Sequence, residues 1–297
     1  MCHSQGSGRS LLLVHAHPDD ETLWTGGTIA RYSSAGVRVT LVTCTLGEEG
    51  EVIPAELRGL AASSADQLGG YRVGELRAAC TALGVADQRF LGGIGRWRDS
   101  GMAGTPANER PRAFVNGSLE EQAAALAEIL AEVRPQVVVS YDPNGGYGHP
   151  DHIRAHQVTM AAVGARADVE AVYWTAVSRS TVRDGLAALA PLDGLPFALP
   201  SEGELPHVPD EAVTTTVDIA AHLPAKLAAM RAHATQVSVW EGPAGARAYA
   251  LSNGLAHPVA TVEEYTLAGG RLAAEEVATD LFGAGFGAGL GAEPGRP

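Results

Sequence analysis

The stretch LLLVHAHPDDE at residues 11–21 decides the fold of this chain. Its apolar half is typical of a strand that is buried on both faces of a parallel sheet. Its acidic end opens a helical pattern over residues 20–34, and the helix dipole favours carboxylates in a first turn. The stretch therefore predicts a strand that passes directly into a helix, with histidines and aspartates at the turn between them.

A second stretch repeats this arrangement. The sequence GHPDH at residues 148–152 follows an apolar run at residues 137–139 and precedes a helical pattern over residues 153–163. Ligands of open α/β sheets bind outside the carboxyl ends of the strands, so we expect the two clusters to meet there. Histidine and carboxylate suit zinc, and three protein ligands plus water is the composition of a catalytic zinc site. Together the clusters predict a metal-dependent hydrolase.

Strand and helix patterns alternate through residues 1–178. This alternation predicts βαβ units with right-handed crossovers, and hence an α/β fold with a Rossmann-like, doubly wound, mostly parallel sheet. Ser118 and Glu121 have the spacing of a capping box and mark the start of one helix. Further strands are expected at residues 37–44, 89–91, 136–141 and 170–177. Further helices are expected at residues 60–83, with a break at residues 69–70, and at residues 118–132.

The organisation changes after Ser178. We assign residues 1–178 to a catalytic domain and residues 179–281 to a smaller C-terminal α+β portion that closes one side of the site. Residues 282–297 form a glycine-rich tail, which we expect to be disordered because its composition cannot build a core. Within the C-terminal portion we expect a linker at residues 190–210, strands at residues 214–219 and 262–267, and a helix at residues 224–233.

The composition limits the partners. With 45% hydrophobic residues the 297-residue chain can bury a large core, and no apolar stretch approaches the roughly 18 residues of a membrane span. The net charge of −13 disfavours nucleic acid and anionic membranes, which attract basic surfaces. The cysteines at positions 2, 44 and 80 form no Cys-x-x-Cys pair, as is typical of a reduced protein. We therefore expect a cytoplasmic enzyme with a small-molecule substrate, and the sequence indicates no particular oligomeric state.

Simpler interpretations of the two clusters explain less. Acids at a helix start are common N-caps, but capping accounts for one of the three acids at residues 19–21 and not for His17 or the second cluster. Adjacent carboxylates repel each other unless a cation or a function holds them. A Rossmann-like binding module without catalysis would carry Gly-x-Gly-x-x-Gly after the first strand, where this chain has His-Pro-Asp-Asp. His15, within the strand, is expected only to pack or to form a hydrogen bond. Two histidines and a carboxylate also describe iron(II) sites, so Fe²⁺ stays open beside Zn²⁺.

The motifs HPDDE at residues 17–21 and HPDH at residues 149–152 make the chain similar to the zinc-dependent N-acetylglucosaminyl deacetylase family, the LmbE/PIG-L-like enzymes. The likeness covers most of residues 11–160 and continues more weakly through residues 233–236. The run GRWRDSGM at residues 95–102 is the most discriminating stretch, because the family in general does not require it. Further stretches that carry the likeness are residues 44–51, 65–72 and 141–149.

The resemblance implies the metal ligands and the base. His17, Asp20 and His152 would bind one zinc ion and leave a position for water and the substrate carbonyl. Asp19, next to a ligand, would be the general base. A catalytically inactive zinc scaffold is disfavoured because the chain retains Asp19 together with Tyr147 and His149.

The resemblance also implies the remaining roles. Tyr147 and His149 would stabilise the oxyanion and protonate the amine, and the division between them stays open. Asp151 would orient or charge His149 as its hydrogen-bond partner. The resemblance implies N-acetylglucosaminyl-inositol as the substrate, and its inositol hydroxyls would be bound by Arg72, Asp99 and Glu51.

The expected reaction is hydrolysis of the acetamide of N-acetylglucosaminyl-inositol, a step of mycothiol biosynthesis. One alternative is the amidase that cleaves mycothiol S-conjugates, but its pattern has a lysine in the stretch equivalent to residues 22–27, and this chain has none. A generalist deacetylase of N-acetylglucosamine-type sugars is the other.

Overall fold

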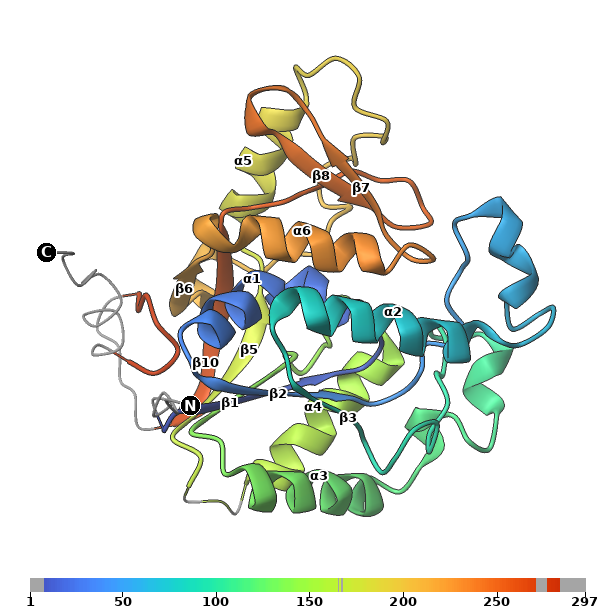
Figure 1. Cartoon of the computed structure of the whole chain (residues 1–297), viewed down its shortest axis with the longest axis vertical. Coiled ribbons are helices and arrows are strands. Elements are labelled where there is room, and N and C mark those ends of the chain that lie inside the picture. Colours follow the sequence, from blue (N-terminus) through green and yellow to red (C-terminus); the bar gives the residue numbers. More distant parts are fainter. Residues whose placement is uncertain (1–7, 165, 167, 271–276, 284–297) are drawn as a thin grey trace, which may run out of the picture.

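The computed structural model describes residues 8–164, 166, 168–270 and 277–283. A seven-stranded sheet in the order β3-β2-β1-β4-β5-β10-β6 forms its centre, with helices on both faces (Figure 1). The first five strands pair in parallel, which confirms the expected α/β class. They are β1 Ser10–His15, β2 Arg38–Thr43, β3 Asp87–Phe90, β4 Val137–Ser140 and β5 Ala171–Ala176.

Strand β1 is the point at which the strand order reverses. It pairs with β2 on one side and with β4 on the other, so the chain builds outward from β1 in both directions. In open α/β sheets the crevice at such a reversal is where ligands bind. The two His/Asp clusters follow β1 and β4, and the topology therefore brings them to one crevice.

The helices pack on opposite faces according to the alternation of side chains in β1. Leu11 and Leu13 belong to the core between the sheet and helices α1 and α2. Leu12 and Val14 belong to the core on the other face, between the sheet and helices α3 and α4. Ser118 caps α3 by accepting the backbone N–H of Glu121, which confirms Ser118 as the N-cap of this helix, while the Glu121 carboxylate pairs with Arg96. These helices are α1 Asp20–Ser34, α2 Leu68–Leu83, α3 Leu119–Val133 and α4 Pro150–Val163.

The segment after residue 178 contributes to two sheets. Its strands β6 Thr215–Asp218 and β10 Val262–Gly270 extend the central sheet, with β10 antiparallel to both β5 and β6. A separate antiparallel sheet packs near α5 and lies above α6 (Figure 1). The domain boundary at residue 178 stays a prediction, since part of the C-terminal portion shares the central sheet. The other elements are α5 Arg179–Leu189, α6 Leu223–Ala232, β7 Ser238–Glu241, β8 Arg247–Ala250 and β9 His257–Pro258.

One expected helix begins later in the structure than predicted. Helix α2 begins at Leu68 and not at residue 60, so Gly69 lies in its first turn and does not break it. A Cβ on Gly69 would lie 2.6 Å from Glu48 Cγ, so only glycine fits at this position without a shift of Glu48. Short 3₁₀ helices occupy the connections Ala55–Leu60, Pro106–Glu109, Phe114–Asn116, Asp210–Ala212, Ala220–His222 and Pro243–Gly245.

The expected tail begins inside the packed structure. Phe282 stacks edge-on against Tyr32 with ring centroids 5.4 Å apart, and the backbone N–H of Leu281 donates to the Tyr32 hydroxyl. Phe282, the first residue of the expected tail, thus packs against the core, and the disorder of the tail stays a prediction. Residues 284–297 lie outside the described residues.

Two further expectations concern cysteines and membranes. Cys44 and Cys80 are free and buried, and Cys2 lies outside the described part of the chain. Among the described helices, none is long and apolar enough to cross a bilayer.

Candidate active site

The two clusters meet at the carboxyl ends of β1 and β4. Oδ2 of Asp20 lies 3.4 Å from Nδ1 of His17 and 3.4 Å from Nε2 of His152, and all three side chains are buried. The same oxygen accepts the backbone N–H of His17 at 2.9 Å, which fixes the carboxylate. Burial alone would raise the pKa of Asp20, but His152 and His17 hold it well below its usual value. The structure thus brings together the three residues predicted as ligands.

The environment of the His152 ring fits a metal ligand. Its Nδ1 lies 3.2 Å from the carbonyl oxygen of Gly145 and donates to it, so the Nε2 lone pair faces the site. Nε2 is buried and has no hydrogen-bond partner within the described residues. An unpaired buried polar atom is costly, and a cation beside the Asp20 carboxylate would satisfy it. The donor set therefore fits a metal ion.

Other groups around His17 could also hold a cation. Ring nitrogens of His17, His149 and His152 lie within 4.8 Å of one another, and a second such set joins His17 to Asp99 and Asp151. The second set is explained by hydrogen bonding, since Nε2 of His17 lies 3.3 Å from Asp151 Oδ2 and 3.5 Å from Asp99 Oδ1. Carboxylates on the outer nitrogen of a histidine ligand orient its ring and raise its basicity. His17 Nδ1 is then the nitrogen that faces Asp20.

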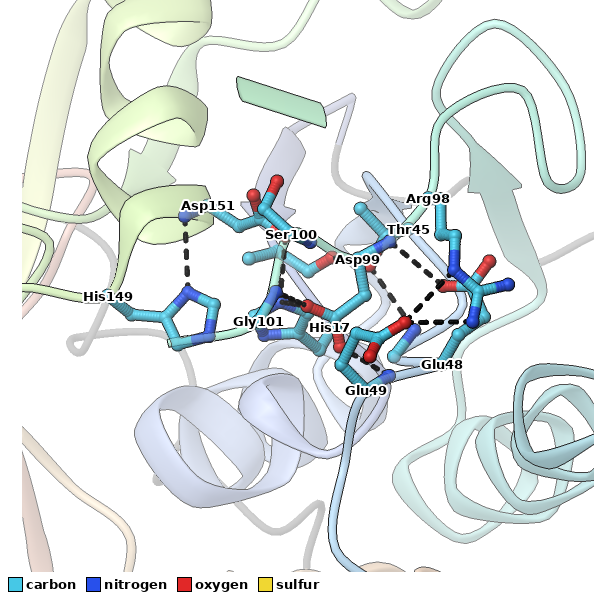
Figure 2. A network of polar contacts seen from close by, with 12 residues as sticks. His17, Thr45, Glu48, Glu49, Arg98, Asp99, Ser100, Gly101, His149 and Asp151 are labelled. Atoms are coloured by element: carbon cyan, nitrogen blue, oxygen red, sulfur yellow. Dashed lines mark hydrogen bonds and ion pairs between the residues drawn. The ribbon is translucent and has the colours of Figure 1, made fainter. Parts of the chain in front are cut away.

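The position of Asp151 differs from the expected one (Figure 2). Its carboxylate accepts from His17 and, at 2.9 Å, from the backbone N–H of Ser100. Only its backbone N–H reaches His149, donating to Nδ1 at 3.1 Å. This arrangement follows from the start of α4, where His149 is the N-cap and its imidazole accepts the first-turn N–H of Asp151. The carboxylate of Asp151 is then free to face His17. The expected contact between Asp151 and His149 is thus made by the backbone of Asp151, and its carboxylate contacts His17.

Asp19 stands at the N-cap position of α1, but in the described structure its side chain makes no capping hydrogen bond. Instead Oδ2 of Asp19 lies 3.1 Å from Nη2 of Arg72. Its φ of 109° is a conformation that residues other than glycine rarely adopt, and such strain clusters at functional sites. Burial raises the pKa of Asp19 to about 6, and Arg72 opposes that shift. Side-chain capping of the helix therefore does not explain Asp19.

A buried pair behind Asp19 was not predicted as part of the site. Nε2 of His233 lies 2.6 Å from Oε1 of Glu21, and neither side chain is exposed. The other oxygen of Glu21 accepts the backbone N–H of Asp19 at 2.9 Å. Burial would lower the pKa of His233, but Glu21 raises it above its usual value. The only signal in the sequence was the weak likeness over residues 233–236, because spacing cannot connect positions 212 residues apart.

Tyr147 and His149 flank the three residues predicted to bind the metal. The ring centroid of Tyr147 lies 4.9 Å from that of His152, and its side chain is 43% exposed. Burial together with His17 and His152 lowers the pKa of His149 to about 3. Because Nδ1 of His149 accepts the amide of Asp151, the neutral ring carries its proton on Nε2. His149 is thus a hydrogen-bond donor beside the predicted metal ligands.

Comparison with known proteins now identifies the family. Residues 12–163 match the model of the PIG-L family, described as GlcNAc-PI de-N-acetylase. The chain belongs to the PIG-L family. The matched range contains both clusters and all three predicted metal ligands.

Two curated relatives extend the likeness beyond the PIG-L range. One relative is a protein of Actinosynnema mirum, named 1D-myo-inositol 2-acetamido-2-deoxy-alpha-D-glucopyranoside deacetylase. It is 64% identical to this chain, and the match covers 92% of this chain and 96% of the relative's length. One of Saccharopolyspora erythraea, named as deacetylase 1 for the same compound, is 63% identical over 92% of this chain and 93% of its own. The solved structure of GalB, a 4-carboxy-2-hydroxymuconate hydratase from Pseudomonas putida, matches 90% of this chain and 99% of its own with a TM-score of 0.54. At 19% identity it bears on the fold alone.

In this PIG-L member two of the three residues predicted to bind inositol are buried. Arg72 donates to the carbonyl oxygens of Gly47 and Pro18 as well as pairing with Asp19. Asp99 accepts the backbone N–H groups of Glu49 at 3.1 Å and Gly101 at 2.8 Å (Figure 2). Both side chains thus already have protein partners, whereas Glu51 is exposed.

Ion pairs hold the loop that carries Asp99. Arg98 Nη2 lies 2.8 Å from Glu49 Oε1 and 2.6 Å from Asp66 Oδ1, and Glu49 also pairs with Arg110. Glu48 accepts the backbone N–H of Asp99 at 3.0 Å. Arg98 and Asp99, which belong to the run at residues 95–102, therefore hold this loop beside His17.

Proposed function

We propose that the protein hydrolyses the acetamide of 1D-myo-inositol 2-acetamido-2-deoxy-α-D-glucopyranoside, releasing acetate and the free amine, a step of mycothiol biosynthesis. It is an N-deacetylase of the PIG-L family. The observation that carries the proposal is the juxtaposition of the His17–Asp20–His152 cluster with the buried carboxylate of Asp19. The identity of 64% to a curated deacetylase of this compound supports the choice of substrate.

We assign the metal site to His17, Asp20 and His152, and the metal to zinc, which their donor atoms suit. When bound, the ion supplies Lewis-acid activation of water and of the acetyl carbonyl. Asp151 and Asp99 hold the outer nitrogen of His17, and the Gly145 carbonyl holds that of His152. These contacts fix both imidazole rings before substrate arrives.

Asp19 acts as the general base. A pKa of about 6 leaves it ionised at neutral pH yet able to take a proton, as an efficient base requires. Arg72 binds Oδ2 and keeps the side chain directed at the site. Asp19 accepts the proton of the attacking water and returns it to the leaving amine, so the C–N bond breaks without a charged amide anion. Asp19 thus takes the protonation step that the family resemblance gave to Tyr147 or His149.

His149 and Tyr147 stabilise the oxyanion. His149 is neutral and donates from Nε2, because Nδ1 is occupied by the Asp151 amide. The hydroxyl of Tyr147, on the glycine-rich loop before α4, provides a second donor. A single donor of this kind contributes about 10²–10³-fold to kcat.

An amine-release assay tests the proposal. The metal-loaded protein would be given the sugar–inositol, N-acetylglucosamine and a mycothiol S-conjugate, with metal analysis of the same preparation. We expect kcat/KM to be highest for the sugar–inositol and one zinc per chain. Faster cleavage of the S-conjugate would make the protein an amidase, and equal rates on both sugars would make it a generalist deacetylase.

A further inference from the structure

Glu21 lies between the predicted base and a histidine from the C-terminal part of the chain. One carboxylate oxygen, Oε2, accepts the backbone N–H of Asp19 at 2.9 Å, and the other lies 2.6 Å from Nε2 of His233. Glu21 and His233 have no exposed surface. Neither can touch a substrate, and the proposed chemistry uses neither of them.

The backbone of Asp19 needs such a partner. Its φ of 109° is a strained conformation, which persists only where neighbouring groups hold it. On the carbonyl side, the oxygen of Asp19 accepts the N–H groups of Thr22 at 2.9 Å and Leu23 at 3.0 Å, which belong to α1. On the amide side, the hydrogen bond to Glu21 holds the peptide. The direction of the Asp19 side chain therefore depends on both contacts.

His233 is itself fixed from outside α6. Two residues further on, Thr235 donates its backbone N–H and its hydroxyl to Glu75 of α2 at 2.8 and 2.7 Å. The carbonyl of Thr235 accepts the N–H of Ile53 at 3.0 Å. The segment at residues 233–235 thus spans between the helix that carries Glu21 and the loop after β2.

We propose that Glu21 and His233 are positioning residues for the general base. His233 fixes the Glu21 carboxylate, and Glu21 holds the Asp19 peptide in the strained conformation that directs its side chain at the attacking water. This inference rests on the proposed function, in which Asp19 is the base.

The test compares kcat, KM, bound metal and melting temperature. For Glu21→Ala we expect kcat to fall about 100-fold, as small misplacements of a reacting group can cause, with KM nearly unchanged and the metal stoichiometry retained. Glu21→Gln keeps an oxygen that can accept the Asp19 N–H, so it should restore most of kcat. Loss of metal from Glu21→Ala would overturn the proposal, because Glu21 would then act through Asp20.

Glu75→Ala is the matched control. Glu75 is a buried carboxylate that anchors the same segment through Thr235, and in the described structure the polar partners of Asp19 are Arg72 and Glu21 and not Glu75. We expect its melting temperature to fall about as much as that of Glu21→Ala, while kcat falls far less. Parallel losses of kcat in both variants would show that Glu21 only stabilises the fold.

Two further measurements separate the inference from the proposed function. His233→Ala combined with Glu21→Ala should have the kcat of Glu21→Ala alone, since His233 acts through Glu21, and additive losses would contradict this. A crystal structure of Glu21→Ala should show Asp19 outside the positive-φ region, and an unchanged Asp19 would overturn the inference. If the wild type released no amine, the proposed function would fail, whereas the crystal structure would still decide the role of Glu21.

Discussion

Arg72 of α2 holds the carboxylate of Asp19 at the start of α1, with Nη2 3.1 Å from Oδ2 and the arginine almost completely buried. An arginine so placed lowers the pKa of its partner and fixes its orientation. Asp19 nevertheless has a raised pKa, because burial outweighs the arginine. The balance between the two sets the pH at which the base becomes ionised.

The first prediction concerns this balance. With the Asp19 pKa at about 6, kcat/KM should fall as the pH drops through that value, since the protonated carboxyl cannot accept a proton. Arg72→Gln removes the charge that lowers the pKa, so the acidic limb of the pH–rate profile should move to higher pH. A limb that stayed in place would mean that Arg72 contacts substrate and does not tune Asp19.

The second prediction separates the ligand from the base. Asp20→Ala should leave the protein without stoichiometric metal, because Asp20 lies 3.4 Å from both histidines of the cluster. Asp19→Asn should keep the metal and lose about 10²–10⁴-fold in kcat, the usual contribution of a general base. Metal analysis and kcat of the same preparations decide the matter. Loss of metal from Asp19→Asn would reject this division of roles.

The third prediction concerns the oxyanion donors. Tyr147→Phe and His149→Ala should each lower kcat more than they raise KM, because the donors act mainly in the transition state. His149→Gln, which retains a neutral N–H donor, should keep more activity than His149→Ala. If both residues changed KM alone, they would be substrate-binding groups.

The fourth prediction concerns Asp99. Asp99→Ala removes an acceptor beside His17 Nε2 and two backbone hydrogen bonds, so we expect metal affinity to fall by about 10–100-fold, as when the partner of a histidine ligand is removed. Turnover of the sugar–inositol and of N-acetylglucosamine should both fall. An additional loss confined to the sugar–inositol would reveal the contact with inositol that the family resemblance implies.

The fifth prediction concerns two helical glycines. A Cβ on Gly27 of α1 would lie 2.4 Å from Cδ1 of Ile219, so Gly27→Ala should destabilise the fold by about 1–3 kcal/mol through overpacking. Gly74 of α2 has nothing within 4 Å of its Cβ position, and Gly74→Ala should stabilise by about 0.5–1 kcal/mol. Chemical denaturation measures both. Equal effects would show that helix propensity, and not packing against Ile219, governs the first site.

The sequence predicted those features that local patterns encode. Apolar runs followed by His/Asp clusters located β1 and β4, and the crevice between them follows from the topology of parallel sheets. The partners of Asp151 could not be predicted, because they depend on how the first turn of α4 faces His17. His233 could not be predicted either, since a hydrogen bond to a residue far away in the chain leaves no periodic trace. The small sheet β7-β8-β9 was missed because its strands are short and partly exposed.

The strand order of the central sheet also constrains the sequence of events during synthesis. Strand β6 joins the sheet only through β10, which is the last strand of the described chain. A nascent chain that has emerged only as far as α6 therefore has β6 without its sheet neighbour. Because long-range pairing must await the later segment, β6 cannot enter the sheet before the ribosome has made residues 262–270. A stalled or clipped chain would thus present an open edge at β5, which is where aggregation of truncated forms should begin.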